Sequence, residues 1–175
     1  NANLQRYAEA FSFLQSKNLY TVDDLENTLH SMQDKIDALK KSASAKQARI
    51  KEVDALLRMV DYYKSGKPAA DKLKSIRFEK SRQKYKSEHD NELRTFYMAE
   101  RKLKPYFKDG KLPITAWRKE RAQLEQEYRD IQTELSPLHA DAKKLWAIHY
   151  NIYEVQHEQE RQNTELRQKK QEIEH

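Results

Sequence analysis

Apolar residues recur at alternating spacings of four and three between residues 25 and 60, without a slip. This first stripe consists of Leu25, Leu29, Met32, Ile36, Leu39, Ala43, Lys46, Ile50, Val53, Leu57 and Val60. Ten of its eleven positions are apolar, and only Lys46 interrupts it. Such a heptad pattern predicts one long helix whose stripe must be buried against a partner helix, as in a coiled coil.

A second heptad pattern follows in the last third of the chain. This second stripe consists of Ile114, Trp117, Arg121, Leu124, Tyr128, Ile131, Leu135, Leu138, Ala142, Leu145, His149 and Ile152. It stays in phase across Pro137, which predicts one kinked helix and not two helices. Polar residues then occupy the heptad positions at Gln156, Gln159 and Asn163, so we expect residues 156–175 to be an exposed or frayed helical end.

The middle of the chain looks helical but lacks a clean heptad. Gly66 and Pro68 predict the end of the first long helix, because glycine commonly follows a helix and proline opens one. We expect one or two helices over 69–107, with a bend near 89–91, and a loop over 108–113 that contains an Asp-Gly pair. The expected inward residues are Leu73, Ile76, Leu93, Phe96, Tyr97 and Leu103.

The first residues form a shorter pattern. Residues 2–18 are typical of an amphipathic helix. Its expected apolar face is made of Leu4, Tyr7, Ala8, Phe11 and Leu14. Thr21 then offers a hydroxyl that can cap the following helix.

These patterns together predict an all-α fold: an elongated antiparallel coiled-coil hairpin of two long helices. We expect a single domain over 1–175, with a short helix at 1–20, a long helix at 21–65, a basic helical connector at 66–113 and a long kinked helix at 114–175. The two stripes span roughly 53 and 57 Å at about 1.5 Å per residue, so their lengths match. The sequence leaves open whether the helices pair within one chain or in a homodimer. The chain begins without Met and its helical pattern runs to its end, so we expect a fragment of a longer protein.

Composition narrows the class further. Of the 175 residues, 35% are charged and 37% hydrophobic, and 2 Gly and 4 Pro leave little room for the turns of a β-fold. The absence of cysteine excludes disulfides and thiolate metal sites, and it fits a reducing compartment. No stretch reaches the roughly 18 apolar residues that a membrane span needs.

The net charge of +6 is concentrated in the middle of the chain. Between Lys64 and Lys111 there are fifteen Lys and Arg against seven Asp and Glu. The densest part is the basic segment, residues 72–86, which holds seven basic residues and one acidic residue, with Phe78 and Tyr85 interleaved. The basic residues are Lys72, Lys74, Arg77, Lys80, Arg82, Lys84 and Lys86.

A helix through the basic segment would place Arg77, Lys80 and Lys84 on one face. Such a face offers charges to the phosphate backbone of DNA without reading its sequence, and a neighbouring ring can stack on an unpaired base. Two other interpretations remain. The segment can be a solvated helix face that keeps the protein soluble, or it can bind an anionic membrane or protein surface.

The sequence holds no recognisable catalytic constellation. The histidines show no metal-binding spacing, and His149 falls in the second stripe as a partly buried residue. Tyr62 and Tyr63 lack the activating base or metal that a nucleophile needs, so we expect Tyr63 to pack and Tyr62 to lie on the surface. Trp117 is expected in the core. We therefore predict a protein that is not an enzyme and that carries no cofactor and no metal.

Several segments together resemble a known family. The helix at 25–39 is followed by Leu-Leu-x-x-Val-x-x-Tyr at 56–63, the basic stretch at 74–89, Tyr-Met-Ala-Glu-Arg-Lys-Leu-Lys at 97–104 and Gly-Lys-Leu-Pro-Ile at 110–114. This series resembles the C-terminal helical region of relaxase/mobilization proteins from conjugative elements of Gram-positive gut bacteria. The resemblance extends from about Leu19 to Leu135.

The resemblance implies an accessory role in plasmid or transposon transfer. Relaxases nick DNA through a tyrosine and a histidine-bound metal in an N-terminal catalytic domain, and the chain has no counterpart of that histidine cluster. The resemblance therefore implies a cytoplasmic bacterial region that holds DNA, self-associates or docks proteins of the transfer machinery. The alternatives are a coiled-coil dimerisation scaffold without a nucleic-acid role and, last in rank, a scaffold on anionic membranes.

Overall fold

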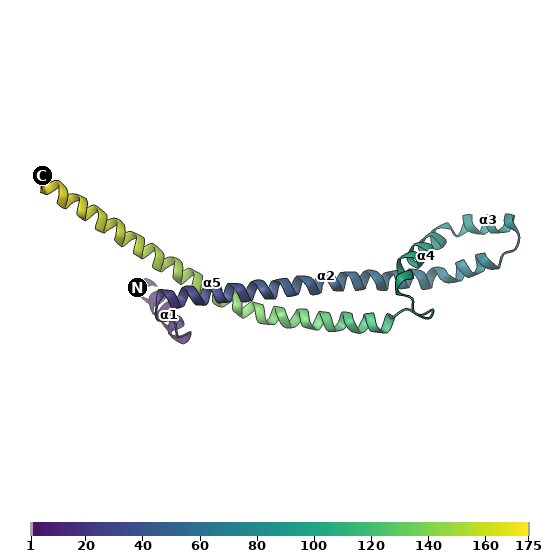
Figure 1. The fold of residues 1–175 in the computed structure, drawn as a ribbon, viewed down its shortest axis with the longest axis horizontal. Helices are drawn as coiled ribbons and strands as arrows, with labels where there is room; N and C mark the ends of the chain where they lie inside the picture. The colour runs from purple at the N-terminus through teal and green to yellow at the C-terminus, as the bar shows by residue number, and fades with distance from the viewer. Residues whose placement is uncertain (1, 175) are drawn as a thin grey trace. The chain divides into compact units, whose positions relative to one another are not determined.

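The computed structural model describes residues 2–174, which form five α-helices and one 3-10 turn (Figure 1). The elements are α1 (Ala2–Ser16), α2 (Val22–Ser75), α3 (Glu79–Glu88), α4 (Asp90–Leu103), the 3-10 turn η1 (Lys104–Tyr106) and α5 (Ile114–Ile173). Within these residues there is no β-strand, only an isolated bridge between Lys108 and Lys111. The predicted all-α class is confirmed.

The chain divides into two compact units. Unit 1 comprises Asn1–Lys41 and Ile131–His175, and unit 2 comprises Ser42–Asp130. Both long helices, α2 and α5, pass through both units. The expectation of a single domain therefore stays a prediction.

In unit 1, the first part of the first stripe is buried against the last part of the second stripe. Leu25 and Leu29 of α2 pack with Leu145 of α5, which is fully buried. A second cluster joins Ile36 of α2 to Leu135 and Ala142 of α5. The polar edge of this contact carries an ion pair between Lys35 and Glu134 (3.2 Å) and a hydrogen bond between the side chains of Glu26 and His149 (3.1 Å).

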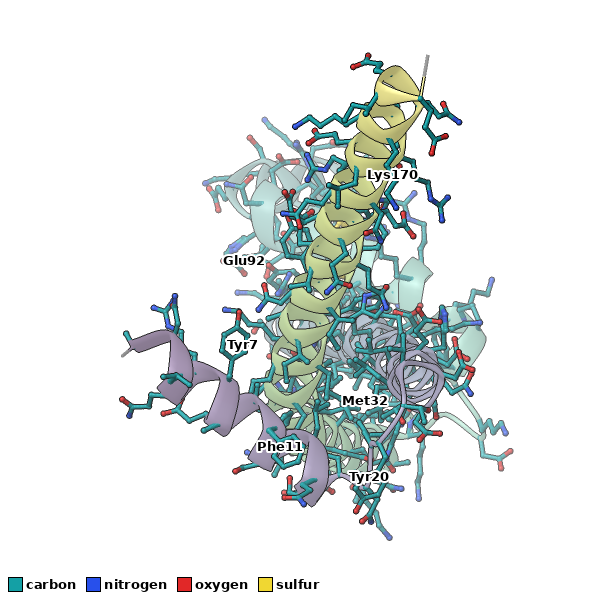
Figure 2. All side chains as sticks on the ribbon, turned by 90° about the vertical axis from the view of Figure 1, so that its left-hand side faces the viewer. Tyr7, Phe11, Tyr20, Met32, Glu92 and Lys170 are labelled. Carbon is teal, nitrogen blue, oxygen red and sulfur yellow. The ribbon has the colours of Figure 1, made fainter. Side chains whose placement is uncertain are left out.

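Of the predicted apolar face of α1, only Leu14 is half-buried and packs in unit 1. Leu4, Tyr7, Ala8 and Phe11 are exposed, and Tyr7 and Phe11 can be seen on α1 in Figure 2. The contacts come instead from the C-terminal end of α1 and the following turn, and they involve Phe13, Leu14 and Leu19. The turn fixes this orientation, because the Leu19 N–H donates to the Leu14 carbonyl (3.0 Å) and Lys17 pairs with Asp141 (2.6 Å).

In unit 2, the second half of the first stripe meets the start of the second. Val53 and Val60 of α2 pack with Trp117 of α5 and with Leu103 at the end of α4. All eleven positions of the first stripe and all twelve of the second are buried or half-buried, so both predicted stripes are confirmed. Lys46, the one polar member of the first stripe, is half-buried and pairs with Glu127 (2.7 Å).

The prediction that the first long helix ends at residue 65 is wrong. Helix α2 continues through Gly66 and Pro68 to Ser75. Gly66 allows α2 and α4 to pack closely, because a Cβ at this position would lie 2.6 Å from the Cβ of Phe96 on α4. A proline inside a helix costs about 3 kcal/mol. Here the helix beyond it buries Ala70 and Leu73 against α3 and α4, and this burial offsets that cost.

Shorter-range predictions fare better. The expected bend near 89–91 is confirmed, because α3 ends at Glu88 and α4 begins at Asp90. Asp109 and Gly110 both have positive φ (51° and 72°) in the loop at 108–113, which is the conformation that an Asp-Gly turn favours. The Thr21 hydroxyl accepts a hydrogen bond from the Asp24 N–H (3.0 Å), so the predicted cap is confirmed.

Two further expectations have mixed outcomes. Five of the six expected inward residues of the middle segment are buried or half-buried, but Tyr97 is 39% exposed. Its neighbour Phe96 occupies the inward position of α4, and Tyr97 only touches the Phe96 ring edge-on (5.3 Å between centroids). Helix α5 runs unbroken through Pro137, as predicted, whereas a kink there stays a prediction.

Ion pairs at the edges of the stripes shift the pKa of several groups in unit 2. Arg49 donates two hydrogen bonds to Glu120 (2.6 and 3.1 Å), which lower the pKa of Glu120 and raise that of Arg49. A hydrogen bond from Lys46 lowers the pKa of Glu127, and a hydrogen bond to Asp54 raises that of Arg121. The two helices are thus joined by charge as well as by apolar contact.

Replacing Gly66 by alanine should destabilise the protein. In an ordinary exposed helix this change is favourable, but here the new methyl group meets the Cβ of Phe96, and overpacking costs about 1–3 kcal/mol in the free energy of unfolding. Urea denaturation followed by circular dichroism measures it. Ser65→Ala, at an exposed neighbouring position, is the control and should leave stability nearly unchanged. A more stable Gly66→Ala variant would contradict the close packing of α2 and α4.

Glu120→Gln should lower the melting temperature at neutral pH. The folded pKa of Glu120 lies below its ordinary value of about 4.5. The pair with Arg49 therefore stabilises the folded chain above about pH 4.5, and its contribution is lost as the pH falls through the folded pKa. The difference in melting temperature between the native chain and Glu120→Gln should shrink below pH 4.5. Glu165→Gln, an exposed control without an ion pair among the described residues, should show no such pH-dependent difference.

Candidate nucleic-acid interface

Charge separates strongly between the two units. The residues of unit 2 include 23 Lys and Arg against 14 Asp and Glu, a net charge of +9. The remaining residues include 11 and 14, a net charge of −3. An anionic partner would therefore be attracted to unit 2 and weakly repelled by unit 1.

The sequence suggested one helix through the basic segment, but the structure divides the segment between two helices and a link. Lys72 and Lys74 lie in the last turn of α2, Arg77 lies in the link at 76–78, and the other four basic residues lie on α3. The chain leaves α2 through a tight turn, in which the Ile76 N–H donates to the Leu73 carbonyl (3.3 Å). The predicted helical stripe through Arg77, Lys80 and Lys84 is therefore wrong, because the helix is interrupted after Ser75.

A single buried ring holds α3 in place. Tyr85 is only 9% exposed and packs with Leu73 of α2 and Leu93 of α4. The ammonium group of Lys72 lies 5.4 Å from the centre of the Tyr85 ring. Tyr85 is therefore unable to stack on a base, contrary to one of the expectations from the sequence. Its role is to present the rest of α3 to solvent.

The seven basic residues are accessible, and most lack a carboxylate partner. Six of them are exposed and Arg82 is half-buried. Lys84 lies 3.9 Å from Glu88, a weak contact one helical turn away. Among the described residues, no ion pair within 4.0 Å involves the remaining six. This differs from the α2–α5 contact, where Lys46, Arg49 and Arg121 are all paired with carboxylates.

Sequence reasoning missed two features of this site. It did not foresee that Lys72 would cover the Tyr85 ring, or that Arg82 would be partly withdrawn. The spacing of Arg82 and Tyr85 could have predicted the partial burial of Arg82. Residues three apart lie on the same side of a helix, and Tyr85 faces the core.

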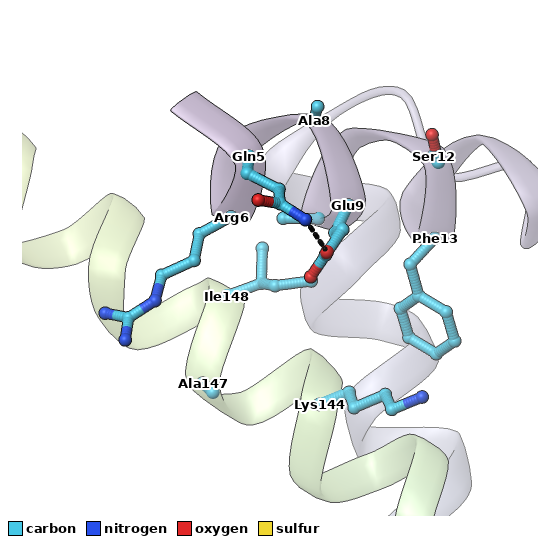
Figure 3. A pocket seen from close by; sticks show the side chains of 10 residues that line it. Gln5, Arg6, Ala8, Glu9, Ser12, Phe13, Lys144, Ala147 and Ile148 are labelled. Atoms are coloured by element: carbon cyan, nitrogen blue, oxygen red, sulfur yellow. Dashed lines mark hydrogen bonds between the residues drawn. The ribbon is translucent and has the colours of Figure 1, made fainter. Parts of the chain in front are cut away.

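A second feature of the surface is a hollow of 890 Å³ between α1 and α5 in unit 1 (Figure 3). Its floor is apolar, with Phe13, Ala147 and Ile148, and Arg6, Glu9 and Lys144 lie around it. The Glu9 carboxylate accepts a long hydrogen bond from Gln5 (3.5 Å).

The residues considered for catalysis or metal binding pack, form a side-chain contact or lie on the surface. Tyr63 stacks on Phe96 (5.0 Å between ring centroids), and Tyr62 is 37% exposed, both as expected. His149 is half-buried and pairs with Glu26, and Trp117 is buried. In the part of the chain that the structure describes, no three His, Asp or Glu side chains gather in a way that could hold a metal ion.

Neither the hydrophobicity of the helices nor comparison with known proteins points to a function. None of the helices within residues 2–174 has a stretch that is both long enough and apolar enough to cross a membrane. Comparison of the chain with protein-family models, with curated proteins and with solved structures finds no significant match.

Proposed function

We propose that this chain is a non-catalytic nucleic-acid-binding protein that contacts the phosphate backbone of DNA without reading its sequence. The contact is made by the seven basic residues of the basic segment. The observation that carries this proposal is that six of the seven are exposed, and that among the described residues six have no carboxylate partner within 4.0 Å. On an ordinary solvated helix face, basic and acidic residues one turn apart pair with each other, as Arg49 and Glu52 do on α2 and Arg121 and Glu125 do on α5.

The proposal includes a specific arrangement of the long helices, an antiparallel coiled-coil hairpin. Two pairs in unit 2 support it, because Lys46 pairs with Glu127 while Asp54 pairs with Arg121. As the residue number rises on α2, it falls on α5. The pairs of unit 1 follow the same rule, with Glu26 near His149 and Lys35 near Glu134.

We further propose that the chain belongs to a DNA mobilization protein, as an accessory region in conjugative transfer. The support is the sequence resemblance to relaxase/mobilization proteins together with the exposed positive charge of unit 2. In this proposal the DNA-nicking chemistry belongs to another part of the parent protein. The present region holds the DNA backbone near that chemistry and has a cytoplasmic location.

The protein should retard both duplex and single-stranded DNA at low salt, with an affinity that falls steeply as salt is added. Each neutralised phosphate contributes about 0.9 to the slope of log K against log salt for duplex DNA, so five to seven contacts predict a slope of about −4 to −6. Fluorescence anisotropy over a salt series measures it. Absence of binding at about 50 mM salt would refute the proposal.

A triple variant locates the contact. Replacing Arg77, Lys80 and Lys86 by glutamine should reduce the steepness of the slope by about 3, because each lost phosphate contact removes about 1. The matched control removes the same charge from unit 1, through Lys40→Gln, Lys41→Gln and Lys143→Gln at exposed positions. If both variants weaken binding equally, net charge alone drives the interaction and the basic segment has no special role.

A second candidate function is self-association through the end of α5. Every residue from 153 to 173 is exposed, although the heptad positions continue in phase beyond Ile152. Leu166 and Ile173 occupy such positions and are 63% and 83% exposed. A second copy is the proposed occupant, because a parallel pair would match Asn163 with itself and set Lys169 against Glu174 of the other copy.

Light scattering should then show a mass twice that of the chain. Replacing Leu166 and Ile173 by glutamate should convert the dimer to a monomer, because it places four like charges in the contact. Gln168→Glu with Gln171→Glu adds the same charge at outer heptad positions and should leave the dimer intact. A monomeric native chain at all concentrations would exclude this candidate.

A further inference from the structure

Phe78 is the most exposed aromatic side chain that the structure describes. Its relative exposure is 78%, in a link of three residues between α2 and α3. The link itself is anchored, because Ile76 packs against the cluster that contains Leu73 and Tyr85. The exposure of Phe78 is therefore a property of a fixed segment and does not come from a free chain end.

The position of Phe78 is also fixed by its backbone. It is the residue before α3, in an extended conformation (φ −89°, ψ 126°). Its carbonyl accepts the first hydrogen bond of α3, from the Arg82 N–H (2.9 Å). Phe78 is thus part of the helix start, at the point where the basic segment turns from α2 into α3.

Phe78 differs from two other exposed rings of unit 2, Tyr97 and Tyr106, each of which has a ring partner. Tyr97 rests edge-on against Phe96, and Tyr106 against Trp117 (5.3 Å between centroids in each case). Phe78 has no such ring partner among the described residues, and most of its surface is exposed to solvent. It is flanked by Arg77 and Lys80, which are exposed and have no ion pair among the described residues.

An open ring between free cations is the arrangement that proteins use to bind single-stranded nucleic acid. The cations follow the phosphates, while the ring stacks on a base, and stacking is tolerant of base identity because every base has a flat face. In a duplex these faces are already covered by neighbouring base pairs. A ring of this kind therefore favours unpaired strands.

We propose that Phe78 stacks on an unpaired base and that the preferred ligand of the basic segment is single-stranded nucleic acid. This inference rests on the proposed function, since it assigns a ligand class to the same site. Arg77 and Lys80 hold the backbone on either side of the stacked base, and the half-buried Arg82 lies one turn further into α3.

The test compares a thymidine oligonucleotide with a duplex of the same length, both at fixed salt. Phe78→Ala should weaken binding to the single strand by about 5- to 150-fold, the range found for loss of one base–aromatic stack. It should leave duplex binding unchanged, because no charge is removed. Tyr20→Ala is the control, since Tyr20 is 71% exposed but lies in unit 1, and it should alter neither affinity.

A tryptophan variant gives a direct signature of stacking. Phe78→Trp should keep the single-strand affinity, and the emission of the new indole should be quenched by the single strand and unaffected by the duplex. The signal is measured against the native chain, which has Trp117 and Trp146.

The outcomes separate the two proposals. If the native chain binds both ligands and Phe78→Ala weakens neither, or weakens both equally, the stacking proposal is overturned and the backbone contact stands. If the native chain binds neither ligand, both proposals fail. Selective loss of single-strand binding, with quenching in Phe78→Trp, supports both.

Discussion

The apolar stripes of α2 and α5 are buried against each other in both units, and the other contacts of the protein are built on that burial. Neither helix could hold its length in water by itself, since an isolated helix gains little from propensity alone. With Leu25, Val53 and Leu145 almost fully buried, each helix becomes the support of the other. Helix α4 then attaches to this support in unit 2, and α1 attaches to it in unit 1.

Charge determines how the long helices are matched along their edges. An apolar stripe is tolerant of sliding by a heptad, because each layer looks much like the next. Lys46 in the first stripe and Arg121 in the second reduce this tolerance, since each must meet a carboxylate on the other helix. The same contacts between the helices lower the pKa values of Glu120 and Glu127, because each carboxylate accepts a hydrogen bond from a cation on α2.

The cations of the basic segment are arranged differently from the cations beside the stripes. Cations next to the stripes are neutralised by partners, whereas those around α3 are held out in solvent by the burial of Tyr85. A net charge of +9 on unit 2 repels itself, and binding a polyanion would relieve that repulsion. The exposed Phe78 adds a flat apolar face to the same surface. The proposed DNA contact thus follows from where charge is left unpaired.

The sequence by itself determined the two stripes, the Thr21 cap, the Asp-Gly turn and the exposure of α5 after Ile152. These features depend on periodicity or on a few adjacent residues, and local physics decides them. It also located the basic segment, but not its conformation. Only the tertiary structure decided that Gly66 is a contact with Phe96 and not a helix end, that Tyr85 is buried while Phe78 is open, and that α1 leaves Leu4 and Phe11 exposed. In each case the deciding partner lies on another helix, far away in the sequence, and no local pattern carries its position.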